Sequence, residues 1–344
     1  MKKILEPMQA FYAMKEMLGS DAPYGDCMCM ADLATLNHFS LSNLEIIYNL
    51  QFTYKFVESN SVGNLAFGLD TPLFVKREDI LKGLGINIIE KHPQTDLLVD
   101  NIRESIMNNR PIFLFVDLFY QKGRYFYYNN QHGVHACLVY GFDDENQAVY
   151  TIDNYDGYNT YIVSYDMIVQ YCKGIFEYCH NFRKDSLYFR EYCFEGTDLK
   201  FDEAYNNTII CRFFKNSLGK ADERNKSLGS IAVLNERLEE LMNISGFEEN
   251  LSSVSYKKNS EYFMIRNLYQ YNVFNKATQL EIDRRLNIII ENWARIGSIV
   301  QHYTKTKKNL DEKCKKIRMR LNSIYEYEIG YTDFLYSQFK QFVG

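Results

Sequence analysis

The strongest constraint on the fold is a change of hydrophobic pattern near residue 225. Beyond that point, three long stretches repeat apolar residues at about 3.6-residue intervals, and none of them contains proline. Such a pattern is typical of amphipathic helices that pack together in a bundle. The stretches cover residues 227–243, 277–305 and 309–342. The C-terminal third of the chain is therefore predicted to be a helical bundle.

The first 195 residues instead mix helical and strand patterns. Nearly continuous apolar runs of strand length alternate with segments of helical periodicity, and the turn residues Asp-Asp-Glu-Asn separate two of the strands. Helices are predicted over 40–56 and 96–109, strands over 111–120, 134–142 and 147–155, and a strand leading into a helix over 159–172. We expect an α+β domain over 1–211, a polar linker over 212–230 and a helical domain over 231–344.

Composition excludes several classes of protein. The formal net charge of −5 argues against a general nucleic-acid binder, and no run approaches the roughly 18 apolar residues of a membrane helix. The N-terminus begins like a signal peptide, but Glu6 and Pro7 interrupt its apolar run. We therefore expect a cytoplasmic protein whose eight cysteines are mostly free thiols.

No cofactor and no metal are expected. The cysteines form no C-x-x-C pair, and Cys27 and Cys29 are too close together for a usual zinc site. Cys172, Cys179 and His180 lie near one another in the chain, but their spacing matches no common site. Buried thiols are the preferred interpretation of that segment.

Cys27 and Cys29 stand at a predicted helix start in the segment "GDCMCMADLATL". Asp26 is a favourable N-cap residue, so Cys27 falls in the first turn, where unsatisfied N–H groups and the helix dipole favour a thiolate. At about 100° per residue the two thiols point nearly opposite ways. Cys29 aligns with Leu33 as a packing residue, and Cys27 is the candidate nucleophile.

His135 is the best-placed base for such a nucleophile. It lies on a predicted strand, and Asp153 follows 18 residues later on the next strand. A loop with an odd number of residues, centred on Asp144, would place the two side chains directly opposite on one face. A loop of two or four residues without a bulge would place them on opposite faces. With the correct register, Asp153 would orient the imidazole.

Two other histidines are alternative candidates for the base. His132 lies in an apparent loop, "NNQHG", for which the sequence offers no matching acid. His38 would lie roughly 16 Å from the Cys27 thiol along the helix, which is too far to act on it.

These segments resemble a known group of proteins. "GDCMCMADLATL" is similar to the Asp-Cys helix start of C39-type peptidases, and "HACLVYGFDDENQAVYTIDNYDG" resembles their His-to-Asp segment. The papain signature C-G-[SA]-C-[WY] is absent. Together with the C-terminal helices, the plan resembles the butirosin acyltransferase group, papain-like enzymes that form amide bonds in antibiotic biosynthesis. Within that group, the branch active in closthioamide biosynthesis is the nearest.

The resemblance implies a papain-like cysteine protease fold, in which a helix bearing the Cys packs on an antiparallel sheet bearing His and Asp. It implies that an acyl or peptidyl chain, thioamidated in the closthioamide branch, passes from a carrier-protein thioester to a small amine or diamine. Cys27 would be the nucleophile, His135 the general base and acid, and Asp153 the orienting residue. No nucleic-acid or membrane partner is implied.

One departure concerns the oxyanion hole. Papain-type enzymes carry a Gln a few residues before the Cys, but residues 18–26 read "LGSDAPYGD". The Cys27 backbone N–H, with Ser20 or Tyr24, would have to serve instead. The aromatic run "YFYYNN" (125–130) is either a tunnel lining or an ordinary strand edge, and the basic segment 305–320 is either a docking surface or a solvated helix face.

Two other functions fit the same residues. One is a cysteine peptidase or amidase that uses the same triad, and the other is a papain-like binding module without catalysis. Acyl transfer and hydrolysis both need a reactive Cys27, whereas a binding module does not.

Overall fold

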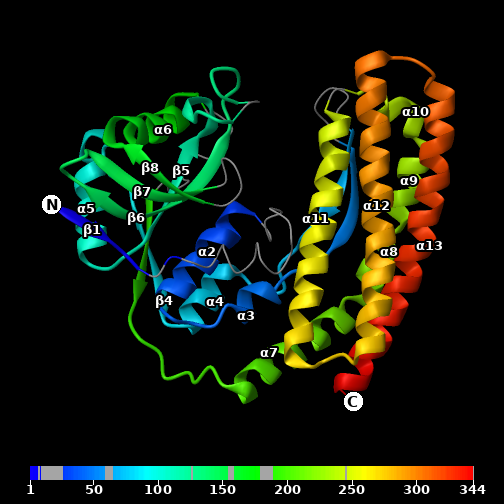
Figure 1. The fold of residues 1–344 in the computed structure, drawn as a ribbon, viewed down its shortest axis with the longest axis horizontal. Coiled ribbons are helices and arrows are strands. Elements are labelled where there is room, and N and C mark those ends of the chain that lie inside the picture. Colours follow the sequence, from blue (N-terminus) through cyan, green and yellow to red (C-terminus); the bar gives the residue numbers. More distant parts are fainter. Residues whose placement is uncertain are drawn as a thin grey trace. The chain divides into compact units, whose positions relative to one another are not determined.

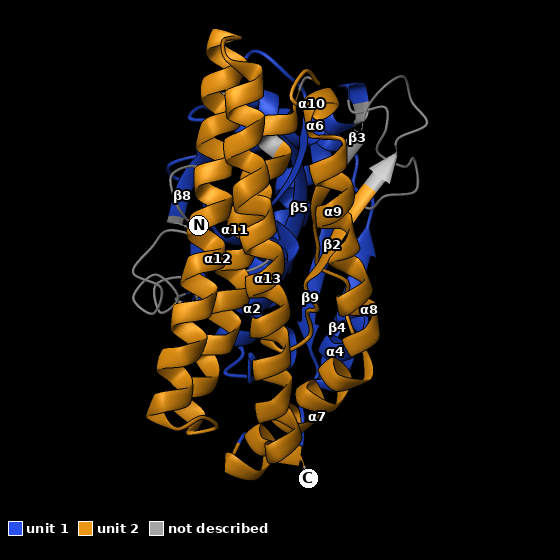
Figure 2. Ribbon diagram, turned by 90° about the vertical axis from the view of Figure 1, so that its right-hand side faces the viewer, with its two compact units in different colours: residues 1–46, 75–201 blue, residues 47–74, 202–344 orange. Residues whose placement is uncertain are grey.

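The computed structural model describes residues 1–6, 8, 26–58, 65–124, 127–153, 159–178, 189–244 and 246–343. Its fold is α+β, with an antiparallel sheet and a C-terminal helical region, as the sequence predicted (Figure 1). Two compact units are distinguished by colour in Figure 2. Unit 1 comprises residues 1–46 and 75–201, and unit 2 comprises residues 47–74 and 202–344.

Unit 1 is built on a seven-stranded antiparallel sheet of order β4-β9-β5-β6-β7-β8, with β1 also paired to β6. The central strand β5 is almost wholly buried, in keeping with its continuous apolar sequence. The strands are β1 (Lys2–Ile4), β4 (Ile86–Lys91), β5 (Ile112–Asp117), β6 (Val134–Asp143), β7 (Ala148–Asp153), β8 (Asn159–Ser164) and β9 (Phe189–Phe194).

Helices cover this sheet. Helix α2 and helix α5 both pack against β6, α6 packs against β5, and α4 packs against β4. Their bounds are α2 (Cys27–His38), α4 (Arg77–Gly83), α5 (Leu98–Met107) and α6 (Tyr165–Tyr178), with short 3₁₀ turns at η1 (Thr95–Leu97) and η2 (Leu118–Tyr120). Helix α2 is buried from Cys29 through Leu36, as its apolar residues on every face predicted.

Unit 2 combines helices with a β-hairpin. The hairpin strands β2 and β3 pair from Thr53 with Asp70 to Glu58 with Leu65. Helix α11 packs on β3, and α11, α12 and α13 pack in succession. The elements are β2 (Thr53–Glu58), β3 (Leu65–Asp70), α7 (Glu203–Gly219), α8 (Ala221–Ser227), α9 (Gly229–Glu236), α10 (Leu238–Leu241), α11 (Phe247–Asn267), η3 (Leu268–Tyr271), α12 (Lys276–Thr306) and α13 (Leu310–Val343), with α3 (Leu44–Ile47) at the boundary of the units.

A charged network is buried inside unit 2. The Nζ atom of Lys258 lies 2.6 Å from carboxylate oxygens of both Glu261 and Glu328, and Arg224 lies 2.6 Å from Glu261. The hydroxyl of Tyr54, on the hairpin, donates to Glu328 at 2.6 Å. Two cations therefore compensate two carboxylates. Without this pairing, burying the charges would cost a large desolvation free energy.

Two sequence predictions about the fold are wrong. The expected linker, 212–230, is helical and belongs to α7, α8 and α9. On α7 the side chains of Phe213, Phe214 and Ser217 are buried, so this part of the segment packs as a helix although its composition is mostly polar. The expected helix 40–56 contains only the four residues of α3 before the chain enters β2. There Tyr54 is buried and the next residue, Lys55, is exposed, because successive side chains of a strand point to opposite faces.

Candidate active site

Cys27 is the first residue of α2, as predicted. The N-cap Asp26 has extended backbone angles, and its Oδ1 accepts a hydrogen bond from the N–H of Cys29 at 2.7 Å. Its other oxygen, Oδ2, accepts from Arg77 at 2.8 Å. The Asp26 carboxylate is thus fixed by both the Cys29 N–H and Arg77, and this determines where the first turn of α2, with Cys27, begins.

The two neighbouring cysteines have different environments. Cys29 is 1 % exposed, and its burial raises the pKa of its thiol far above the ordinary value. Cys27 is partly exposed, and its side chain is close enough to His135 to raise the pKa of that imidazole. Cys29 is therefore a core residue, and Cys27 is the thiol that adjoins a base.

His135 and Asp153 are in direct contact. The Nε2 atom of His135 lies 2.7 Å from Oδ1 of Asp153, and these side chains are only 11 % and 1 % exposed. With Nε2 bound to the carboxylate, Nδ1 is the ring nitrogen left to interact with Cys27. The structure thus brings together the three residues that the sequence singled out.

The register that joins them differs from the prediction. The loop between β6 and β7 has four residues, 144–147, and a β-bulge at Tyr140 shifts the pairing from Gly141 opposite Tyr150 to Val139 opposite Thr151. The bulge adds one residue and so reverses the change of face that an even-numbered loop causes. Of the alternatives that the sequence left open, the loop is even-numbered, and the bulge gives the same-face placement.

Continuing this register places Asp153 opposite Cys137 and diagonal to His135. Gly141 makes the bulge compatible with the neighbouring strand β1. A Cβ atom at this position would lie 2.9 Å from the carbonyl oxygen of Lys3 and 3.1 Å from Cα of Ile4. Only glycine permits β1 to approach so closely.

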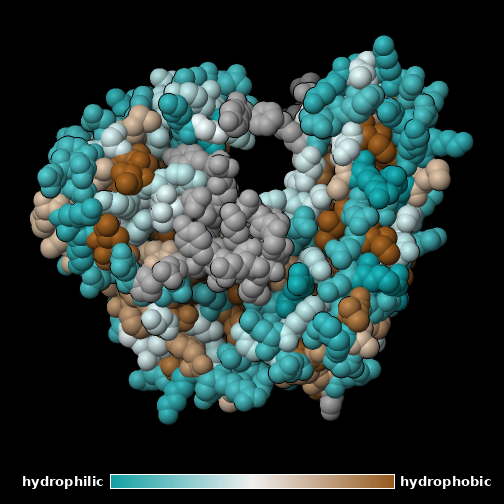
Figure 3. All heavy atoms as spheres, viewed as in Figure 1, coloured by the Kyte–Doolittle hydropathy of each residue, from teal (hydrophilic) through white to brown (hydrophobic). Residues whose placement is uncertain are grey.

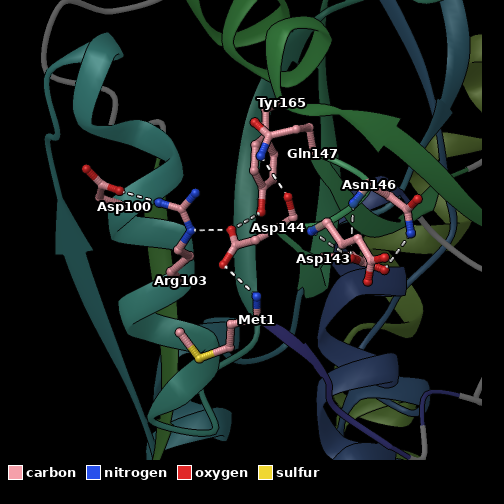
Figure 4. Close-up of polar contacts among 9 residues, drawn as sticks. Met1, Asp100, Arg103, Asp143, Asp144, Asn146, Gln147 and Tyr165 are labelled. Carbon is pink, nitrogen blue, oxygen red and sulfur yellow. Dashed lines mark hydrogen bonds and ion pairs between the residues drawn. The ribbon is translucent and has the colours of Figure 1, made fainter.

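Acidic residues hold the β6–β7 loop in place (Figure 4). Asp144 accepts hydrogen bonds from Arg103 at 2.6 Å and from the Tyr165 hydroxyl at 2.8 Å. Asp143 accepts from the side chain of Asn146 at 2.9 Å. These contacts stabilise one loop conformation, and hence one register for His135 and Asp153.

Two further residues contact Asp153, and no pattern in the sequence indicates them. Arg124 Nη2 lies 2.7 Å from Oδ1, the same oxygen that contacts His135, and Gln121 Nε2 donates to Oδ2 at 3.2 Å. The Nε of Arg124 also donates to Gln121 at 3.1 Å. Both residues lie in the long connection between β5 and β6, where no periodic pattern indicates which side chains turn inward.

These neighbours determine the pKa of His135. Burial lowers it, but the negative charge of Asp153 and hydrogen bonds to Asp153 and Cys27 raise it, and the positive charge of Arg124 lowers it somewhat. The net result raises the pKa of His135 from 6.5 to about 9. At neutral pH the ring is therefore an imidazolium.

Replacing Arg124 by Met tests this electrostatic balance. The Arg124→Met variant is expected to raise the pKa of His135 above about 9, because the guanidinium charge lowers that pKa in the wild type. An NMR titration of the His135 ring measures the change. Arg284→Met, on unit 2, is the control and should leave the titration unaltered. An unchanged or lowered pKa in Arg124→Met would contradict the assignment.

The prediction that His132 has no matching acid is wrong. Its Nδ1 lies 2.6 Å from Oδ2 of Asp117, at the end of β5. The ring is stacked between Phe119 and Tyr178, with both centroids 4.3 Å away. Asp117 also accepts a hydrogen bond from the N–H of Gly133. This second His–Asp pair therefore joins the two ends of the β5–β6 connection, in which Gln121 and Arg124 lie. His38, the other rival, is the last residue of α2.

Several other predicted residues lie outside the described ranges. These are the oxyanion candidates Ser20 and Tyr24, the pair Cys179 and His180, and Tyr125 and Phe126 of the aromatic run. Within the described part of the chain no group of His, Cys, Asp and Glu is arranged to hold a metal ion. The cysteines described there are all free thiols. None of the helices in the described ranges is both long and apolar enough to span a membrane.

Comparison with known proteins finds no protein-family profile and no curated protein that matches this chain.

Proposed function

We propose that this protein is a papain-like acyltransferase that forms an amide bond through an acyl-enzyme on Cys27. The observation that carries the proposal is the arrangement of Cys27, His135 and Asp153: a 2.7 Å contact joins His135 to Asp153, and the thiol at the helix N-terminus is near enough to raise the pKa of His135. A nucleophile, a base and a group that orients the base are the parts that covalent acyl transfer requires.

In the first step, the Cys27 thiolate attacks the carbonyl carbon of a carrier-protein thioester. The C–S bond to the carrier breaks, and the leaving thiolate takes the proton of the His135 imidazolium. The products are an acyl-Cys27 thioester and a carrier thiol. The raised pKa of His135 supports this step, because the ring holds the needed proton at neutral pH.

In the second step, an amine attacks the acyl-Cys27 carbonyl and transfers its proton to the now neutral His135. The amide leaves, and the thiolate and imidazolium are restored. Conversion of a thioester to an amide is downhill, so the reaction needs no ATP. Asp153, which is 1 % exposed, stabilises the imidazolium in both resting and final states.

The donor in this proposal is an acyl or peptidyl chain, thioamidated in the closthioamide-like case, and the acceptor is a small amine or diamine in antibiotic biosynthesis. Transfer to an amine rather than to water requires a site that excludes bulk solvent. The burial of His135 and Asp153 supports this requirement. The free thiols of the described cysteines support a reducing, cytoplasmic location.

The test supplies an acyl thioester of N-acetylcysteamine with and without a diamine and follows the products by mass spectrometry. We expect amide as the main product when diamine is present, and an acyl adduct on Cys27 when it is absent. Free acid that forms equally fast with and without diamine would identify a hydrolase. Failure to form either product or adduct would identify a binding module.

A further inference from the structure

The turn between α12 and α13 concentrates positive charge. Residues 305–320 contain eight Lys or Arg and only two acids, a formal charge of +6, whereas the whole chain carries −5. The remaining residues therefore carry −11. This basic tip, as we call residues 305–320, lies at the end of the α12–α13 hairpin (Figure 1), and its surface is hydrophilic in Figure 3.

Most of this charge is not neutralised within the protein. Lys305, Lys308 and Lys315 are exposed, and no carboxylate of the described residues lies within ion-pair distance of them. Two other cations do have partners: Lys316 lies 2.5 Å from Glu312, and Arg318 lies 2.9 Å from Glu239. These three exposed lysines contribute a strong positive potential at the tip.

The tip has a defined conformation. Lys307 and Asn309 adopt left-handed backbone angles, with φ of 52° and 59°, and Lys307 N–H donates to the carbonyl of Tyr303 at 2.7 Å. The ammonium of Lys307 lies over the Tyr303 ring, 5.1 Å from its centroid. Ordered cations of this kind present a fixed charge pattern to a partner, at a smaller entropy cost than a flexible tail.

We propose that the basic tip docks the acidic carrier protein that delivers the thioester. Met319, 67 % exposed and one helical turn from Lys315, adds an adaptable apolar contact beside the charges, which suits a folded protein partner. The formal charge of −11 on the rest of the chain repels a long polyanion such as nucleic acid, whereas a small acidic protein can bind at the tip alone.

This proposal rests on the proposed acyltransferase function. Since the tip and Cys27 belong to one chain, a carrier held at the tip raises the local concentration of its thioester near the enzyme. Opposite charges also accelerate the encounter, and salt weakens that acceleration. The tip should therefore matter for carrier-bound donors and not for small thioesters.

The experiment compares the full chain with the triple variant Lys305→Gln/Lys308→Gln/Lys315→Gln. The two donors are acetyl-loaded acyl carrier protein, used as a representative acidic carrier, and acetyl-N-acetylcysteamine. We expect kcat/KM for the carrier donor to fall about tenfold at low salt, with a flatter salt dependence, and kcat/KM for the small donor to stay unchanged. The control variant, Lys226→Gln/Lys276→Gln/Lys340→Gln, removes the same charge from exposed positions elsewhere in unit 2 and should behave as wild type.

The outcomes separate the two proposals. Turnover of both donors with no difference between the triple variant and the control would overturn the docking proposal and leave the acyltransferase intact. Absence of turnover with either donor would count against the acyltransferase, and a direct binding measurement would then decide docking on its own. The docking proposal would also be overturned if carrier binding survived the triple substitution, or if the substitution weakened only binding to anionic vesicles or RNA.

Discussion

Cys27→Ala is expected to lower acyl transfer by on the order of 10⁴-fold or more, because removing the nucleophile eliminates the covalent route and leaves only positioning effects. The acyl adduct on the protein should disappear with it. Single-turnover assays with a thioester donor, read by intact-protein mass spectrometry, measure both quantities. Iodoacetamide should alkylate Cys27 in the wild type faster than the other described cysteines, since this thiol lies beside an imidazolium.

Cys29→Ala is the matched control for that substitution. It removes a thiol two residues away in the same helix turn, but one that is 1 % exposed and packed in the core. We expect full acylation together with a loss of about 1 kcal/mol in the free energy of unfolding, typical of a small core truncation. If Cys29→Ala abolished the adduct and Cys27→Ala retained it, the two roles would be reversed.

Asp153→Asn is expected to give the second large effect, a fall in transfer of about 10²- to 10⁴-fold with the shape of the site retained. The amide cannot stabilise the imidazolium and favours a different hydrogen-bonding arrangement of the ring. It also leaves Arg124 without the carboxylate it contacts at 2.7 Å. Stability should fall by about 3 kcal/mol or more, as for loss of one partner of a buried ion pair.

The pH dependence of stability gives an independent measurement. The pKa of His135 is about 9 in the folded protein and about 6.5 in an unfolded chain. Because the folded pKa is the higher one, protonation stabilises the fold by about 3 kcal/mol, fully below pH 6.5, and this contribution is lost as the pH rises through 9. Urea denaturation between pH 6 and 9.5 should show the decline in the wild type.

In Asp153→Asn that decline should be largely absent, since the charge that raises the pKa of His135 is gone. Asp117→Asn provides the comparison, because it makes the same chemical change in the other His–Asp pair of unit 1. The Asp117 variant should keep the decline, since His135 and Asp153 are untouched. Equal pH profiles for Asp153→Asn and wild type would show that Asp153 does not govern the protonation of His135.

The local features of the site were predictable because short-range physics determines them. An Asp before a helix caps it through its own side chain, so Asp26 places Cys27 in the first turn whatever surrounds it. Helical geometry separates Cys27 from Cys29, and strand alternation sets which residues share the face of His135. The amphipathic helices of residues 277–305 and 309–342 likewise carry their periodicity in the sequence itself.

Other features depended on contacts between distant segments. The bulge at Tyr140, which brings Asp153 to the face of His135, accompanies the close approach of β1 to Gly141. Arg124 and Gln121 reach Asp153 from a non-periodic connection, and Asp117 meets His132 only because β5 pairs with β6. The hairpin of residues 53–70 joins the helices through Tyr54 and Glu328, which are 274 residues apart.

The sequence by itself therefore determined the choice of Cys27, His135 and Asp153 as candidate site residues, since each is specified by its own neighbours in the chain. The tertiary structure alone decided the register that joins base and acid, the residues that set their charge, and the unit to which residues 47–74 belong. The physical reason is that hydrogen bonds and packing between segments far apart in the chain leave no periodic trace in either segment.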